Sequence, residues 1–200
     1  MKKWFDMAAI PAFLLFLVLL FTYDKLHVFD EKVASLLYGN TFIGGFHFFG
    51  ETKVMIVVSI GLLGWYAVRR NYHGMLFVIF SIGGGVALNQ MIKRIVERPR
   101  PDLPEQLTTY SFTSTHTTIA LLILFTTVYI VTERMKNGTV KTALWSVAIV
   151  LTILAGLSRI AEGRHFATDV LAAWSFTYAW FIMCKYIYEK SRKENNQRGT

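Results

Sequence analysis

The sequence of 200 residues contains one cysteine, Cys184, so an internal disulfide is excluded. This cysteine lies within an apolar stretch, where packing explains it better than chemistry. The chain also lacks a linker, an internal repeat and a low-complexity segment. Because no such segment divides the chain, we predict one domain.

Charged residues are scarce, since Asp, Glu, Lys and Arg form 17% of the chain and hydrophobic residues form 54%. A soluble domain of this size would expose too much apolar surface. Six apolar stretches cause the bias: Met7–Tyr23, Val54–Val68, Met75–Ile92, Thr117–Thr132, Thr142–Leu157 and Val170–Ile187. Crossing a bilayer takes about 20 mostly apolar residues, so the shortest stretches need flanking polar residues to join the helix.

The predicted fold class is therefore all-α, an integral membrane bundle of six transmembrane helices within residues 1–188. Residues 189–200 are polar and charged, and we expect a disordered cytoplasmic tail there. Gly83, Gly84 and Gly85 interrupt the third stretch, which favours close contact with a neighbouring helix. The first stretch follows two lysines, as a signal peptide would, but residues 21–24 offer no small-residue cleavage site. We expect an uncleaved first helix.

The formal net charge of +8 is explained by topology rather than by nucleic-acid binding. The basic residues fall in four groups at the ends of apolar stretches: Lys2 and Lys3; Arg69 and Arg70; Arg134, Lys136 and Lys141; and Lys185, Lys190, Arg192, Lys193 and Arg198. All four groups share one side if the six spans alternate in direction. The positive-inside rule assigns that side, with both termini, to the cytoplasm of a multi-pass cell-membrane protein.

Three connections then face outward: Asp24–Lys53, Lys93–His116 and Ser158–Asp169. The first mixes phenylalanines with glycines, and two interpretations stay open, an amphipathic helix in the interface or an ordinary surface loop. The other two carry three clusters of polar residues. Ionisable groups next to apolar spans are costly to desolvate, so these clusters predict a functional site.

The first cluster contains Lys93 and Arg100-Pro101. Proline at 99 and 101 disfavours a helix, which turns Arg100 back toward the membrane surface. A guanidinium grips phosphate with two hydrogen bonds, and an ammonium acts as a point charge. Snorkelling to lipid headgroups is the alternative for these cations, and it is our interpretation of Arg94 and Arg98.

The second cluster, Ser114-Thr115-His116, directly precedes the fourth apolar stretch and predicts the N-terminus of its helix. Free N–H groups and the helix dipole favour an anion at such an end. A simple N-cap at Ser114 or Thr113 and an interfacial role for His116 are the alternatives.

The third cluster joins Arg159 to His165 and Asp169, which share one face if both are helical. A carboxylate bonded to one ring nitrogen fixes the tautomer and leaves the other nitrogen free as a nucleophile. Asp169 as an N-cap is one alternative. A metal site formed by both histidines and Asp169 is another, disfavoured because the three cations would repel the metal.

Together the clusters resemble the type 2 phosphatidic acid phosphatase superfamily, whose motifs are KxxxxxxRP, PSGH and SRxxxxxHxxxD. Lys93–Pro101 matches the first motif and Ser158–Asp169 the third. In the middle motif Thr113 replaces proline and Thr115 replaces glycine, whereas Ser114 and His116 are kept. Each motif alone is weak, but their order, spacing and place relative to six spans all agree.

The resemblance implies metal-independent dephosphorylation of a membrane lipid phosphate, with no cofactor. It implies that His165 is the nucleophile, that Asp169 orients it, and that His116 is the general acid and base. The phosphate-binding residues would be Lys93, Arg100, Ser114, Thr115 and Arg159. Phosphatidylglycerol phosphate is the favoured substrate, and undecaprenyl diphosphate or phosphatidic acid are alternatives. A phosphate-lipid binding or transport protein is the non-enzyme alternative, but it leaves two histidines with a dedicated carboxylate unexplained.

The sidedness can be tested with introduced cysteines after Cys184 is replaced. Cysteines at Glu105 and Glu162 should react with an impermeant thiol reagent in intact cells, whereas a cysteine at Asn137 should react only after permeabilisation. The opposite pattern would invert the topology.

Overall fold

A computed structural model describes residues 3–103 and 106–198, and every regular element within these ranges is a helix. The elements are α1 (Lys3–Met7), α2 (Ala9–Thr22), η1 (Tyr23–Lys25), α3 (His27–Leu37), α4 (Thr41–Gly44), η2 (Gly45–Gly50), α5 (Thr52–Val68), α6 (Tyr72–Val78), η3 (Ile79–Gly84), α7 (Gly85–Val96), α8 (Thr115–Thr132), α9 (Gly138–Ala161) and α10 (Ala167–Arg198). Lys2 and Glu105 lie outside the described residues.

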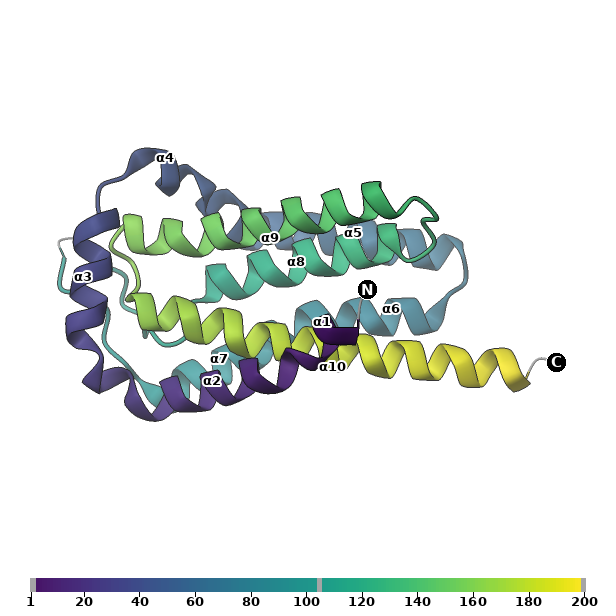
Figure 1. Cartoon of the computed structure of the whole chain (residues 1–200), viewed down its shortest axis with the longest axis horizontal. Coiled ribbons are helices and arrows are strands. Elements are labelled where there is room, and N and C mark those ends of the chain that lie inside the picture. Colours follow the sequence, from purple (N-terminus) through teal and green to yellow (C-terminus); the bar gives the residue numbers. More distant parts are fainter. Residues whose placement is uncertain (1–2, 104–105, 199–200) are drawn as a thin grey trace.

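The long helices run side by side as one bundle (Figure 1). Five segments are long and apolar enough to cross a membrane: Phe5–Lys25, Tyr72–Val96, Thr115–Thr132, Gly138–Ala161 and Ala167–Asn195. A sixth span results if Thr41–Gly50 and Thr52–Val68, which meet at an angle of 43°, form one broken crossing. In that case α4 and η2 supply the part of the span that the short apolar stretch Val54–Val68 lacks. The all-α membrane bundle is confirmed.

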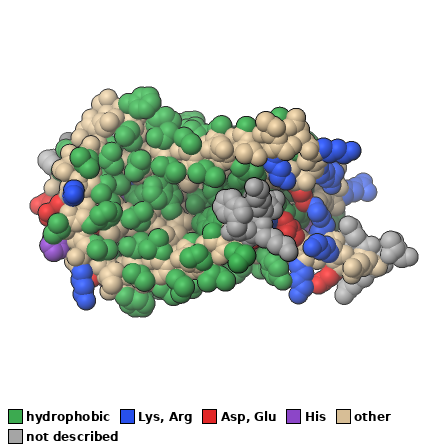
Figure 2. All heavy atoms as spheres, viewed as in Figure 1, with side chains coloured by type: hydrophobic (Ala, Val, Ile, Leu, Met, Phe, Trp, Pro, Cys, Tyr) green, Lys and Arg blue, Asp and Glu red, His purple; other side chains and the backbone are tan. Residues whose placement is uncertain are grey.

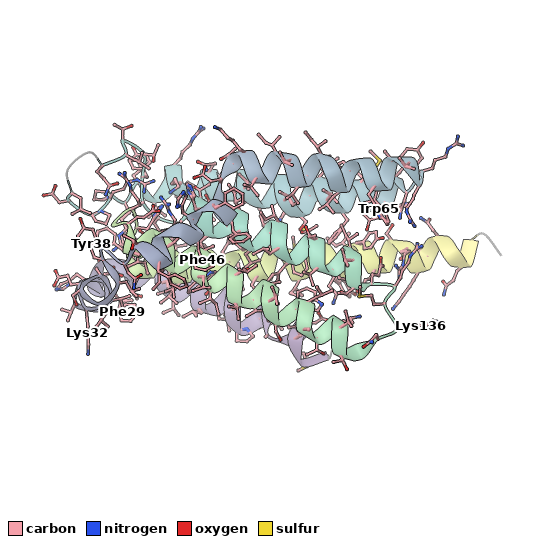
Figure 3. All side chains as sticks on the ribbon, turned by 90° about the horizontal axis from the view of Figure 1, so that it is seen from above. Phe29, Lys32, Tyr38, Phe46, Trp65 and Lys136 are labelled. Carbon is pink, nitrogen blue, oxygen red and sulfur yellow. The ribbon has the colours of Figure 1, made fainter. Side chains whose placement is uncertain are left out.

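Helix α3 lies across one end of the bundle, nearly perpendicular to the long helices (Figures 1 and 3). Phe29, Lys32 and Tyr38 mark this end in Figure 3, where α3 is seen along its axis. The connection Asp24–Lys53 is therefore helical, and the alternative of a surface loop is wrong.

On the face that Figure 2 shows, the basic side chains lie mainly at the opposite end, where the C-terminus lies, and hydrophobic side chains cover the middle. The predicted grouping of Lys and Arg at one end is thus confirmed for the described residues. Helix α10 continues through residues 189–198, so the predicted disorder of the tail is wrong there. Two side-chain contacts hold this part of α10 against α8. Tyr129 Oη on α8 donates to Glu189 Oε1 at 3.0 Å, and Glu133, which follows the last residue of α8, pairs with Arg192.

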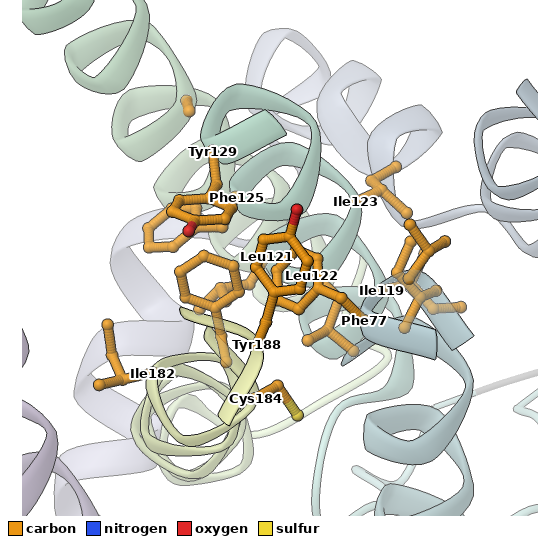
Figure 4. Close-up of a cluster of buried hydrophobic side chains, with 14 of the residues drawn as sticks. Phe77, Ile119, Leu121, Leu122, Ile123, Phe125, Tyr129, Ile182, Cys184 and Tyr188 are labelled. Carbon is orange, nitrogen blue, oxygen red and sulfur yellow. The ribbon is translucent and has the colours of Figure 1, made fainter. Parts of the chain in front are cut away.

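Helix α8 is the centre of the bundle, because it packs against α5, α7, α9 and α10. Its buried side chains Leu122, Phe125 and Tyr129 join Phe77 and Tyr188 in the main hydrophobic cluster (Figure 4). A helix surrounded in this way cannot shift without repacking its neighbours. The first turn of α8 is therefore held firmly at the end of the bundle covered by α3.

Two of the three consecutive glycines at residues 83–85 lie in close contact with a neighbouring helix. A Cβ on Gly84 or Gly85 would lie 2.9 Å from an atom of the Trp180 ring, whereas a Cβ on Gly83 meets nothing within 4 Å. The packing interpretation holds for Gly84 and Gly85 and not for Gly83.

This difference predicts opposite behaviour for two neighbouring substitutions. Gly85→Ala should lower the free energy of unfolding by about 1–3 kcal/mol, because Trp180 and Leu122 must move. Gly83→Ala is the matched control and should leave the protein at least as stable as the wild type, since alanine fits and favours the helix. Thermal unfolding in detergent measures both, and equal losses of stability would contradict the packing interpretation.

Candidate active site

His165 lies in the short turn between α9 and α10, and its side chain is 3% exposed. Gly163 forms the turn with a φ of +64°, and a Cβ there would lie 2.2 Å from Leu103 Cδ1. Only glycine suits both the left-handed conformation and the lack of space. The amide of His165 donates to the carbonyl of Arg159 at 3.2 Å, which fixes the ring next to the end of α9.

The two ring nitrogens of His165 have different surroundings. Nδ1 lies 3.3 Å from Ser111 Oγ and 3.5 Å from Asp169 Oδ2, and the Ser111 hydroxyl itself donates to Asp169. Nε2 lies 3.2 Å from Arg100 Nη1. Because a guanidinium can only donate, we assign the lone pair to Nε2 and the proton to Nδ1. Nε2 thus carries the lone pair and accepts a hydrogen bond from Arg100.

The carboxylate of Asp169 is fully buried. Arg98 Nη1 donates to its Oδ1 at 2.8 Å, and the amide of Phe166 donates to its Oδ2 at 2.9 Å. The Phe166 contact is the reciprocal half of a capping box at the start of α10. Asp169 therefore caps α10 and lies against His165 with the same carboxylate.

Arg98 is buried rather than directed to lipid, so the snorkelling interpretation is wrong for this residue. Its Nη2 donates to Asp30 Oδ2 at 2.8 Å, and its guanidinium lies 4.0 Å from the Phe166 ring centroid. The cause is local: α7 ends at Val96, the next residue, Glu97, has a φ of +51°, and this reversal turns Arg98 back into the protein. Arg94, one turn earlier, is exposed as predicted.

Asp30 connects α3 to the site, and the sequence analysis missed it. This residue is 2% exposed, and it accepts hydrogen bonds from the amide and the hydroxyl of Thr168, both at 2.8 Å. Arg98 therefore bridges two carboxylates, one on α3 and one on α10. Asp30 lies in a connection without any motif, so no signal in the sequence singles it out.

Lys93 and Arg100 are held by backbone carbonyls of the connection between α7 and α8. Lys93 Nζ donates to Tyr110 O at 2.7 Å and Ser111 O at 3.0 Å. Arg100 Nε donates to Thr109 O at 2.8 Å. Burial, together with the neighbouring Arg159 guanidinium, lowers the pKa of Arg100 to about 10, which leaves it charged near neutral pH.

The first turn of α8 carries His116. Ser114 is the N-cap, as the alternative interpretation proposed, and its Oγ accepts from the Thr117 amide at 3.4 Å. The Thr115 hydroxyl donates to Asn89 Oδ1 at 2.9 Å and accepts from Gln90 Nε2 at 3.1 Å. Both hydroxyls are thus engaged within the protein. What this turn offers an anion is its backbone N–H groups, which have no intrahelical acceptor.

Two carboxylates that the sequence analysis did not consider lie among these groups. Glu51 Oε1 is 3.6 Å from His116 Nε2, and Glu162 Oε2 accepts from Arg159 Nη1 at 2.6 Å. His47 lies between them, with its Nδ1 3.0 Å from Glu162 Oε1. Glu162 is a variable position of the third motif, and Glu51 precedes an apolar stretch, so neither stood out in the sequence.

A cavity of about 340 Å³ adjoins His165 between α3 and the turn at Gly163. Its lining is mainly apolar and includes Ala34, Leu103, Ile160 and Phe166. Across residues 3–103 and 106–198, no three His, Cys, Asp or Glu side chains are grouped so that they could hold a metal ion. The site thus combines fixed cations, two histidines and an apolar neighbouring space.

Comparison with known proteins gives consistent matches. The sequence profile of the PAP2 superfamily matches residues 74–193. Phosphatidylglycerophosphatase B of Bacillus subtilis (strain 168) is 29% identical over 141 residues, which cover 69% of this chain and 68% of the relative. The crystal structure of a transmembrane PAP2-type phosphatidylglycerolphosphate phosphatase from Bacillus subtilis superposes with a TM-score of 0.78 at 24% identity. That match covers 91% of this chain and 96% of the other, and at this identity it concerns the fold.

The surroundings of His165 predict how its ring titrates. Burial lowers the pKa of His165 to about 3, with Lys93 and Arg100 acting in the same direction and Asp169 opposing them. NMR of histidine-labelled protein should therefore show a neutral ring with its proton on Nδ1 at pH 5, well below the ordinary pKa of about 6.5. Lys93→Met should raise this pKa and Asp169→Asn should lower it. A ring that is protonated at pH 5 in the wild type would contradict the assignment.

Proposed function

The chain belongs to the PAP2 superfamily and is a lipid phosphatase, and from this premise we propose that it removes the terminal phosphate of phosphatidylglycerol phosphate through a phosphohistidine at His165. One observation carries the proposal: His165 Nε2 faces Arg100 at 3.2 Å, while Nδ1 is held by Ser111 and Asp169. The ring thus presents a lone pair at the place where a guanidinium holds a phosphate.

In the first step the Nε2 lone pair attacks phosphorus and the bond from phosphorus to the lipid oxygen breaks. His116 gives its proton to the leaving oxygen, so the lipid alcohol departs neutral. Asp169 stabilises the positive charge that develops on the His165 ring. In the second step His116 takes a proton from water, the hydroxide attacks phosphorus, and the bond from nitrogen to phosphorus breaks. Inorganic phosphate is released, and both histidines regain their starting states.

The phosphoryl oxygens are held by Lys93, Arg100 and Arg159, with Ser114 and the first-turn amides of Thr115 and His116. Phosphoryl transfer depends mainly on positioning and on neutralising charge, which three fixed cations supply to a dianionic phosphate. The proposed reaction needs no metal and no cofactor.

Phosphatidylglycerol phosphate is favoured as substrate because the name of the Bacillus subtilis relative refers to it. The alternatives are phosphatidic acid, which is also a phosphate monoester, and undecaprenyl diphosphate, in which the bond to be broken is a phosphoanhydride. The apolar cavity beside His165 would accommodate part of the lipid next to the phosphate. We place the site on the outer side of the cell membrane and both termini in the cytoplasm, since the basic groups gather at the end remote from His165.

The direct test is phosphate release from a panel of lipid phosphates by the purified protein in detergent, with and without a chelator. We expect the highest kcat/KM for phosphatidylglycerol phosphate and unchanged activity in EDTA. Binding of these lipids without phosphate release would favour the transport alternative. Loss of activity that zinc or magnesium restores would favour the metal site.

His165→Ala should reduce turnover by more than about a thousandfold, because no other side chain replaces the nucleophile. His27→Ala, which changes an exposed histidine on α3, is the matched control and should behave like the wild type. Labelled phosphate from the substrate should be trapped as an acid-labile, alkali-stable phosphoenzyme in the wild type and not in His165→Ala. Wild-type turnover by the variant would rule out the covalent mechanism.

A further inference from the structure

We propose that Glu51 is a positioning residue: its carboxylate orients the His116 ring and stabilises the positive charge that this ring carries when it gives a proton to the leaving oxygen. The inference rests on the proposed function, in which His116 is the general acid. Glu51 lies 3.6 Å from His116 Nε2, just as Asp169 lies 3.5 Å from His165 Nδ1. Each histidine of the site thus has a carboxylate of its own, supplied by a different part of the chain.

The backbone holds Glu51 in this place. Glu51 is the single residue between η2 and α5, at the break of the sixth span. The preceding Gly50 is buried against His116, and a Cβ there would lie 2.5 Å from His116 O and 2.6 Å from His116 Cβ. The chain can approach α8 this closely only because residue 50 has no side chain. The carboxylate of the next residue is therefore brought to the imidazole by the backbone itself.

The charges around His116 show why such a partner is needed. Besides Glu51, the titratable or charged groups near the ring are Arg159 on α9 and His47 on η2. Glu51 favours the imidazolium, because a carboxylate next to a titrating base stabilises its charged form. Glu162 neutralises part of the Arg159 charge through their contact at 2.6 Å. Among the described residues, Glu51 is thus the carboxylate that lies within 4 Å of the His116 ring.

His47 links the two carboxylates and completes this group. Its Nε2 lies 3.8 Å from Glu51 Oε1, and its Nδ1 lies 3.0 Å from Glu162 Oε1. His47 is on η2, one residue after Phe46, which Figure 3 places toward the end of the bundle that carries α3. Glu51 and Glu162 are both partly exposed, so the group borders the opening of the site.

The proposed part of Glu51 is electrostatic, and it neither gains nor loses a proton during turnover. His116 passes its proton to the leaving oxygen in the first step and recovers one from water in the second. Without Glu51 a smaller fraction of the enzyme starts with a protonated ring. A change of one pKa unit corresponds to about a tenfold change in that fraction, and we expect an effect of this order.

The test compares Glu51→Gln with the wild type on two substrates, a lipid alkyl phosphate and an aryl phosphate. The alkoxide leaving group needs a proton and the aryl oxide hardly does. Glu51→Gln should therefore lose about tenfold or more in kcat/KM on the alkyl ester and less than about threefold on the aryl ester. The alkaline limb of its pH profile should move to lower pH, and Glu51→Asp should restore part of the loss. Glu162→Gln removes the other carboxylate as the matched control, and it should affect both substrates alike because Glu162 contacts the phosphate-binding Arg159.

A double-mutant cycle separates this role from a general structural one. In a His116→Ala background, Glu51→Gln should cause no further loss, since Glu51 acts through His116. Equal losses on the two substrates, or the same loss with and without His116, would overturn the proposal. A wild-type enzyme that releases no phosphate from any lipid would instead overturn the proposed function, so the two failures can be told apart.

Discussion

The buried carboxylate of Asp169 is the constraint on which the rest of the site depends. An uncompensated charge in the protein interior costs several kcal/mol, so a fully buried carboxylate requires partners from all sides. Arg98, Ser111, His165 and the Phe166 amide supply them, and they come from the α7–α8 connection and the start of α10. Since Arg98 is then itself buried between two carboxylates, Asp30 on α3 becomes part of the same arrangement. One charge thus determines how three segments meet.

The part of the site around Lys93, Arg100 and Arg159 is dominated by positive rather than negative charge. Lys93, Arg100 and Arg159 place three cations there, and such a cluster suits an anionic ligand. Arg159 is paired with Glu162 at 2.6 Å. The two histidines of the site lie on different supports, one on a tight turn and one on the first turn of the most enclosed helix. Neither support is flexible, as accurate positioning of reacting groups requires.

Much of this arrangement could be predicted from the sequence, because apolar length gives the spans and the three motifs mark the site. Asp30, Glu51 and Arg98 could not be predicted, for physical reasons that differ. Arg98 depends on a single left-handed residue that reverses the chain. Glu51 depends on a bend of 43° within one span, which hydropathy reads as a short helix preceded by a loop. Asp30 depends on a contact between segments far apart in the sequence, and local patterns do not encode such contacts.

The position of these residues along the chain has an evolutionary consequence. The segment that matches the family runs over residues 74–193, and it holds both histidines, the three cations and Asp169. Asp30 and Glu51, whose carboxylates contact Arg98 and His116, lie before it. The residues that the family profile covers and the two carboxylates that contact them thus belong to separate stretches of sequence. A relative can therefore match this profile over its whole length without carrying either carboxylate.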